Sequence, residues 1–150
     1  MKFVFGLVLG AVFLNAAGIS EIKTVYVFPM HNSLDQYLVC RLAQTHTFEV
    51  VSDPKLADAV FTDSMGPTFQ SAFNKQVLDG KVDASEMPQA FRSSRNTIFL
   101  VSKGKRVIWS TYFAAKDTSA KQLEKASNQV VAHLQKDLGV GPALHASSSR

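Results

Sequence analysis

Residues 97–113, TIFLVSKGKRVIWSTYF, restrict the fold of this chain more than any other stretch. Two runs rich in β-branched and aromatic residues flank a short polar turn that contains Gly104, which is the pattern of a β-hairpin. If Lys103 and Gly104 form a two-residue loop, Leu100 lies opposite Val107. Both runs are apolar on both faces, so the pattern predicts a hairpin at the centre of a sheet that is covered on both sides.

The first elements of the domain predict a β-α-β unit. Strands at 24–28 and 47–51 are short apolar runs, and the leucines of residues 34–44 recur every four residues, which is the spacing of one helix face. Ser33 and Gln36 fit a capping box at the start of that helix. A single helical crossover of this kind joins parallel strands, so we expect the two strands to be parallel.

Asp53 and Pro54 mark the start of a second, very short helix. Asp53 is a good capping residue, and Pro54 suits the first helical position, where its missing amide proton is not needed. The apolar run at 59–62 then predicts a third strand.

Residues 65–95 predict a mobile segment. Periodicity fades there, and prolines, glycines and serines separate thinly spaced phenylalanines. Within it, one short helix is compatible with the spacing of Phe69, Phe73 and Val77.

The strongest helical pattern in the chain follows residue 118. Ser119 and Gln122 fit a second capping box, and Gly139 supplies a C-terminal stop. Residues 140–150 are predicted to be a disordered tail. The apolar face of the helix is formed by residues that step by three or four: Leu123, Ala126, Val130, Leu134 and Leu138.

Together these elements predict one α/β domain over residues 19–139. We expect a two-layer sandwich with a mixed sheet of about five strands, namely the β-α-β unit, a third strand and the central hairpin, plus a long C-terminal helix. The chain has 150 residues, 46% of them hydrophobic, which suffices for one core. Trp109 is the predicted anchor of that core.

The first 18 residues have the organisation of a secretory signal peptide. Lys2 precedes an apolar run that is shorter than the ~20 residues needed to span a bilayer, and residues 15–18 are suited to cleavage. We expect a mature chain that begins between Ala17 and Glu21, has no stable membrane span, and is periplasmic or secreted. Retention of the segment as an anchor is the alternative.

Three short motifs resemble known proteins. They are residues 25–29 (VYVFP), the Asp53-Pro54 step that leads into residues 57–59 (ADA), and residues 107–110 (VIWS). The pattern resembles small exported bacterial proteins of unknown function and, more distantly, α/β modules of envelope proteins such as the curli-secretion lipoprotein and the N-terminal domain of the Tol-Pal translocation protein. The resemblance covers roughly residues 22–138 and implies an interaction role in the envelope. The lipidated cysteine of the lipoprotein group is absent, and no catalytic residue carries over.

The turn after the first strand is a candidate binding segment. It lacks the glycine-rich pattern of a nucleotide site. Side chains of His31, Asn32 and Ser33 at the helix N-terminus are candidates to hold a small anion, and plain helix capping is the alternative.

No pattern indicates a catalytic, metal or cofactor site. The four histidines do not share a ligand spacing. Asp53, Asp58 and Asp63 are interpreted as caps and turn formers. Cys40, the only cysteine, is expected on the exposed side of its helix, where it could at most link two copies as a homodimer. The basic residues are scattered and the net charge is +4, so we expect no nucleic-acid partner.

These observations predict a non-catalytic, exported envelope protein that acts as a protein-interaction or assembly module. The reason is coverage: two long helices cover about one face of a five-stranded sheet, so a helix, the long loop or a partner protein must cover the other. The alternative is a periplasmic protein that binds a small ligand or anion under the 65–95 loop. A thiol or hydrolytic enzyme that uses Cys40 or a His/Asp set is the third hypothesis.

Overall fold

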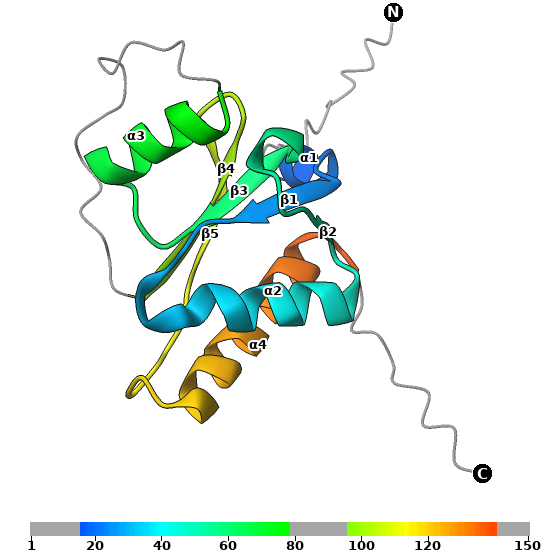
Figure 1. The fold of residues 1–150 in the computed structure, drawn as a ribbon. Helices are drawn as coiled ribbons and strands as arrows, with labels where there is room; N and C mark the ends of the chain where they lie inside the picture. Colours follow the sequence, from blue (N-terminus) through cyan, green and yellow to red (C-terminus); the bar gives the residue numbers. More distant parts are fainter. Residues whose placement is uncertain (1–15, 79–95, 141–150) are drawn as a thin grey trace, which may run out of the picture.

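The computed structural model describes residues 16–78 and 96–140 of the chain. Within these ranges the strands form a mixed five-stranded sheet in the order β2-β1-β3-β4-β5 (Figure 1). The pairs β1–β2 and β1–β3 are parallel, and β3–β4 and β4–β5 are antiparallel. The strands are β1 Thr24–Val27, β2 Glu49–Val50, β3 Ala59–Thr62, β4 Thr97–Ser102 and β5 Val107–Tyr112.

The α/β class, the mixed sheet and the long C-terminal helix confirm the predicted fold. None of the described helices is long and apolar enough to cross a bilayer. The helices are α1 Ala16–Ser20, α2 Leu34–Thr45, α3 Pro67–Gln76 and α4 Ala120–Asp137, and the single turns are η1 His31–Ser33 and η2 Pro54–Leu56.

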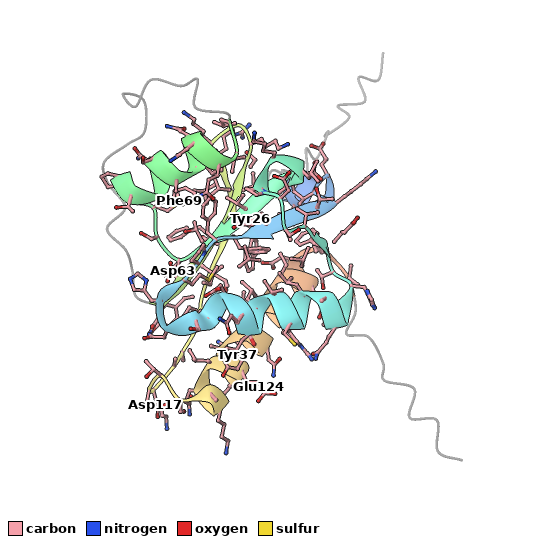
Figure 2. All side chains as sticks on the ribbon, in the orientation of Figure 1. Tyr26, Tyr37, Asp63, Phe69, Asp117 and Glu124 are labelled. Atoms are coloured by element: carbon pink, nitrogen blue, oxygen red, sulfur yellow. The ribbon has the colours of Figure 1, made fainter. Side chains whose placement is uncertain are left out.

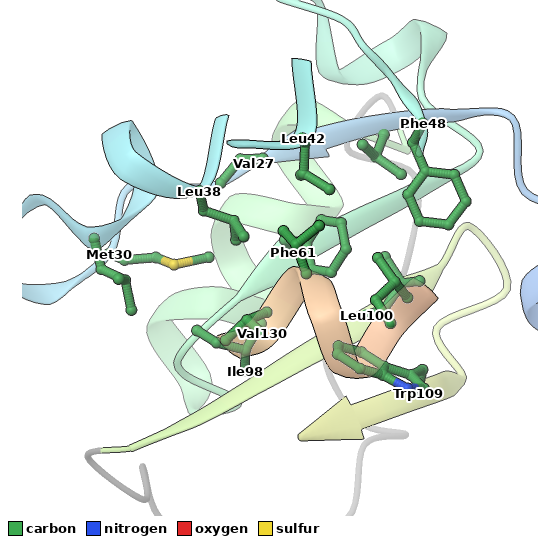
Figure 3. Close-up of a cluster of buried hydrophobic side chains, with 14 of the residues drawn as sticks. Val27, Met30, Leu38, Leu42, Phe48, Phe61, Ile98, Leu100, Trp109 and Val130 are labelled. Atoms are coloured by element: carbon green, nitrogen blue, oxygen red, sulfur yellow. The ribbon is translucent and has the colours of Figure 1, made fainter. Parts of the chain in front are cut away.

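Helices cover the sheet from both sides. The main core lies between the sheet and the pair α2–α4, and Phe61 of β3 is at its centre, where it packs against Phe48 and Trp109 (Figure 3). Helix α3 lies on the opposite face (Figure 1), over a second apolar cluster built on Phe69 and Phe73. The expected two layers therefore become three over part of the sheet, because α3 supplies the cover that the second face needs.

Helix α3 lies inside the segment that we expected to be mobile. The predicted helical spacing is confirmed, since Phe69, Phe73 and Val77 are all buried. Residues 79–95 lie outside the described residues, as do the predicted tail from 141 onward and residues 1–15 of the predicted signal peptide.

The hairpin differs from its prediction in register and position. Leu100 pairs with Trp109, and Val101 with Val107, so that Ile108 is an extra residue in a β-bulge. The loop is longer than two residues: Ser102 N donates to Arg106 O at 2.9 Å.

The hairpin is also not central. Strand β4 is internal and buried, but β5 is an edge strand whose residues are mostly exposed or half-buried. Its face away from α4 carries polar groups such as Ser110 and Tyr112, which need no cover.

Helix ends show which local signals act in the folded chain. Neither predicted capping box forms, because Ser33 and Ser119 make no side-chain cap bond. Asp53 does cap η2 by accepting from Lys55 N at 2.9 Å. Gly139 ends α4 as predicted: its φ is +70°, and Gly139 N and the following amide donate to carbonyl oxygens of the last helical turn.

Asp58 joins the beginnings of β1 and β3. Its Oδ2 accepts from the backbone amides of Lys23 and Thr24, both at 3.0 Å. Thr24 Oγ1 in turn accepts from Asp58 N at 3.1 Å. These backbone hydrogen bonds lower the pKa of the Asp58 carboxyl below its usual value, and the slight desolvation of this exposed carboxyl opposes them. Asp58 is thus a structural clamp, consistent with its interpretation as a turn former.

We expect Asp58→Asn to destabilise the protein by about 1–2 kcal/mol at pH 7. This loss is smaller than for a buried carboxylate, because water competes for the hydrogen bonds of an exposed one. Since the pKa is lower in the folded state, the stabilisation is complete above the unfolded value of about 3.9 and disappears as the pH falls through the folded value. Urea unfolding from pH 7 to about pH 2 measures this. Glu124→Gln, on the exposed face of α4, is the control; a loss in Asp58→Asn that does not change with pH would contradict the clamp.

Candidate ligand site at the carboxyl ends of β1 and β3

The path of the chain creates a switch point between two neighbouring strands. From β1 the chain passes through α2 to β2 on one side, and from β3 it passes through α3 to β4 on the other. Helices α2 and α3 lie on opposite faces of the sheet (Figure 1). In open α/β sheets, ligands bind in the crevice outside the carboxyl ends of the strands at such a point.

His31 and Asp63 meet at this edge. His31 follows β1, and Asp63 directly follows β3. His31 N donates to Asp63 Oδ2 at 2.8 Å, and His31 Nδ1 lies 2.8 Å from the same oxygen. Because its partner is a carboxylate, His31 Nδ1 is the donor in this contact.

The two side chains differ sharply in exposure. Asp63 has only 10% of its side chain exposed, whereas His31 has 75% exposed. Figure 2 shows Asp63 at the edge of the sheet, close to the start of α2. Both His31 contacts use Oδ2, and within residues 16–78 and 96–140 no hydrogen bond reaches Asp63 Oδ1. Among the described residues, Arg41 Nε is the one fully buried side-chain nitrogen or oxygen without a partner, so Asp63 Oδ1 is accessible to water or to a ligand at this edge.

Two cavities lie on either side of the His31–Asp63 pair, and both residues line both of them. We name them by the helix nearest to each. The α4-side cavity has a volume of about 560 Å³ and extends past Asn96 and Phe113 to residues 115–118. The α3-side cavity has a volume of about 570 Å³ and extends under α3. The second is lined, besides the pair, by Phe28, Pro29, Met30, Thr62, Ser64, Thr68, Phe69, Ala72 and Gln76.

The predicted anion residues fall at this edge, with a changed role for His31. The two His31 donors already face the carboxylate of Asp63, so an external anion would compete with an internal one. Asn32 and Ser33 are exposed, with left-handed φ values of 58° and 60°, and Asn32 lines the α4-side cavity.

The sequence interpretation missed the pairing of Asp63 with His31. Asp63 was assigned to a turn, and His31 to a cap or an anion site. The sequence did show that each of the two residues follows a predicted strand. That position alone could not predict their contact, because the direct pairing of β1 with β3 is not visible in the sequence.

The other candidate residues do not assemble into a site. Cys40 is exposed, as expected, and accepts only a long 3.5 Å contact from Gln44 Nε2. His133 Nδ1 lies 2.8 Å from Thr111 Oγ1, far along β5. Among the described residues, no three histidine, cysteine, aspartate or glutamate side chains are grouped to hold a metal ion.

Comparisons of the chain with protein-family models, with curated proteins and with solved structures found no match. The fold and the site by themselves define the class of protein: an α/β domain with a crevice at the switch point of its sheet.

Proposed function

We propose that the protein is an exported, non-catalytic binding protein that holds a small polar ligand at the switch point, next to Asp63. The observation that carries this proposal is Asp63, a carboxylate with 10% of its side chain exposed, whose Oδ1 stays accessible between two cavities at the carboxyl ends of parallel strands. The proposal favours the ligand-binding hypothesis of the sequence over the interaction hypothesis.

Binding is favoured over catalysis by the surroundings of His31. A His–Asp pair orients an imidazole in the way that hydrolytic enzymes orient a general base. Such enzymes also place a hydroxyl or thiol within hydrogen-bond reach of that base. In the described part of the chain, the hydrogen-bonding side chain at His31 is Asp63 alone.

The test uses two aspartates that flank the same strand. Asp63 follows β3 at the proposed site, and Asp58 precedes β3 at the opposite edge. We expect at least one class among small amines, sugars and carboxylates to raise the melting temperature, by several degrees at a concentration near 100 times the Kd. Asp63→Asn should abolish this rise, and Asp58→Asn should preserve it. The proposal fails if no class raises the melting temperature, or if both variants respond alike.

Export is supported by the apolar start of the chain, and the packing just after it narrows the expected cleavage position. Ile19 of α1 is 3% exposed in the main core. Cleavage that leaves Ile19 in the mature chain keeps this contact. Among starts between Ala17 and Glu21, we therefore expect one at or before Ile19. Intact-mass measurement of the exported protein tests this, and retention of Met1 would contradict it.

A partner protein in the envelope remains the second candidate function. The observation that favours it is the outer edge of β5, the last strand in the sheet order, where Val107 is 43% and Tyr112 61% exposed. An open strand edge can pair with a strand of another chain. A photocrosslinker at Tyr112 should capture one discrete partner in cells, and the same group at Gln36 on the exposed side of α2 should not.

A further inference from the structure

We propose that the ligand of the α3-side cavity is a small organic monocation: a protonated amine on an aromatic or branched aliphatic body, with its ammonium group on Asp63 Oδ1. This inference rests on the proposed function and names its ligand class. It follows from the charge of the cavity, the burial of Asp63 and the apolar floor.

The charge of the cavity has one sign. Among the eleven described residues that line it, Asp63 is the only carboxylate, and there is no lysine or arginine. Apart from His31, the one charged side chain in this lining is therefore the carboxylate of Asp63. An anionic ligand would meet Asp63 without a cation to balance it, whereas an ammonium group would neutralise the cavity.

Asp63 keeps one accessible carboxylate oxygen for a ligand. The residue is 7% exposed, and a buried carboxylate is costly unless it is paired and hydrogen-bonded. His31 serves only Oδ2, and from a largely exposed position. Oδ1 can accept an N–H from a ligand, and charge-assisted hydrogen bonds of this kind are stronger than neutral ones.

The rest of the cavity suits an apolar body. Phe28 and Phe69 pack edge to face with centroids 5.5 Å apart, and Met30 and Ala72 extend the apolar lining. Figure 2 shows Phe69 projecting from α3 toward the sheet. The volume of about 570 Å³ is within the range of small-molecule sites.

The α4-side cavity lacks this selectivity. Lys116 and Asp117 join Asp63 in its lining, so charges of both signs face it. Asp117 is exposed, and its Oδ1 already accepts from Ser119 N at 2.9 Å. The charge of that cavity therefore does not select a cation, and the amine is assigned to the α3 side.

Three probes that share a phenylethyl group and differ in their polar end test the charge of the ligand. They are 2-phenylethylamine, its neutral counterpart 2-phenylethanol, and the anion 3-phenylpropanoate, each titrated into the full-length folded protein at pH 7 and followed by amide chemical shifts. We expect the amine to bind at least tenfold more tightly than either of the others, with shifts concentrated at residues 28–31 and 62–72. Asp63→Asn should remove this preference.

Two further variants separate the cavities. Ala72→Leu narrows the α3-side cavity without touching Asp63 and should weaken amine binding at least fivefold. Lys116→Ala, in the other cavity, should change it less than twofold. Because the probe series is measured on the unaltered protein, the result does not depend on whether Asp63→Asn folds.

The possible outcomes separate a failure of the cationic-ligand inference from a failure of the proposed binding function. Tighter binding of the alcohol or the carboxylate at the same residues would overturn the cationic ligand and leave the binding function standing. Shifts confined to residues 113–118 would overturn the choice of cavity. An absence of shifts with all three probes would overturn the inference, while the wider screen of amines, sugars and carboxylates decides the proposed function separately.

Discussion

Trp109→Ala is expected to lower the free energy of unfolding by about 3–5 kcal/mol, a large share of the total for a domain of this size. Trp109 is 7% exposed in the main core, and its ring packs edge to face with Phe61 at 6.4 Å (Figure 3). Its indole Nε1 donates to Asp137 Oδ2 at 2.8 Å and so ties β5 to the end of α4. Alanine would leave a cavity where an edge strand and two helices converge.

Denaturant unfolding of the purified variant measures this loss, and two further variants divide it. Trp109→Phe keeps most of the packing but removes the hydrogen bond, so we expect a smaller loss of about 1–2 kcal/mol. Asp137→Asn keeps an acceptor and should cost less than about 1 kcal/mol. A loss below about 1 kcal/mol in Trp109→Ala would show that Trp109 is not a core anchor.

Phe73→Ala is expected to cost about 3–5 kcal/mol and to release α3 from the sheet. The Phe73 side chain is fully buried, and it contacts Phe69 with ring centroids 5.5 Å apart. Helix α3 has only 10 residues, too few to be stable alone in water, so its order depends on this apolar contact. The α3-side cavity should be lost with it.

Lys75→Ala on the exposed side of α3 is the matched control, with an expected change within about 0.5 kcal/mol. Urea unfolding gives the loss of stability, and hydrogen exchange of α3 amides shows whether the helix opens locally. If Phe73→Ala leaves both the stability and the exchange rates near those of the control, α3 is not held by its apolar face, and the original expectation of a mobile segment is restored.

Local sequence patterns were sufficient to predict a structural element wherever the contacts that determine it are close in sequence. The leucine stripe of α2, the Asp53-Pro54 start of η2 and the Gly139 stop of α4 all appear as predicted. Each depends on residues within one or two turns, whose spacing and backbone preferences act in any context. The parallel pairing of β1 with β2 followed in the same way from a short helical crossover.

Predictions failed where a local signal competed with packing. Ser33 belongs to a capping pattern, yet its φ of 60° leaves no side-chain cap, and Asp35 instead accepts from Met30 N at 3.1 Å. The hairpin loop ends with Lys105 at a φ of 59°, a position that glycine usually occupies, so composition pointed to the wrong turn. The bulge at Ile108 then shifted the register, which residue pattern alone does not specify.

The sequence by itself determined most of the elements, the fold class and the exposure of Cys40, because hydrophobic periodicity and chain-local geometry are encoded residue by residue. Helix α1 was not among them, since its residues fall in the predicted cleavage region. Only the tertiary structure decided the strand order, the third layer and the candidate site. His31 and Asp63 are 32 residues apart, and they meet because β1 and β3 pair in parallel and end at the same edge. That pairing is selected by the packing of the whole sheet against helices on both faces, a balance of many long-range contacts that no short stretch of sequence contains.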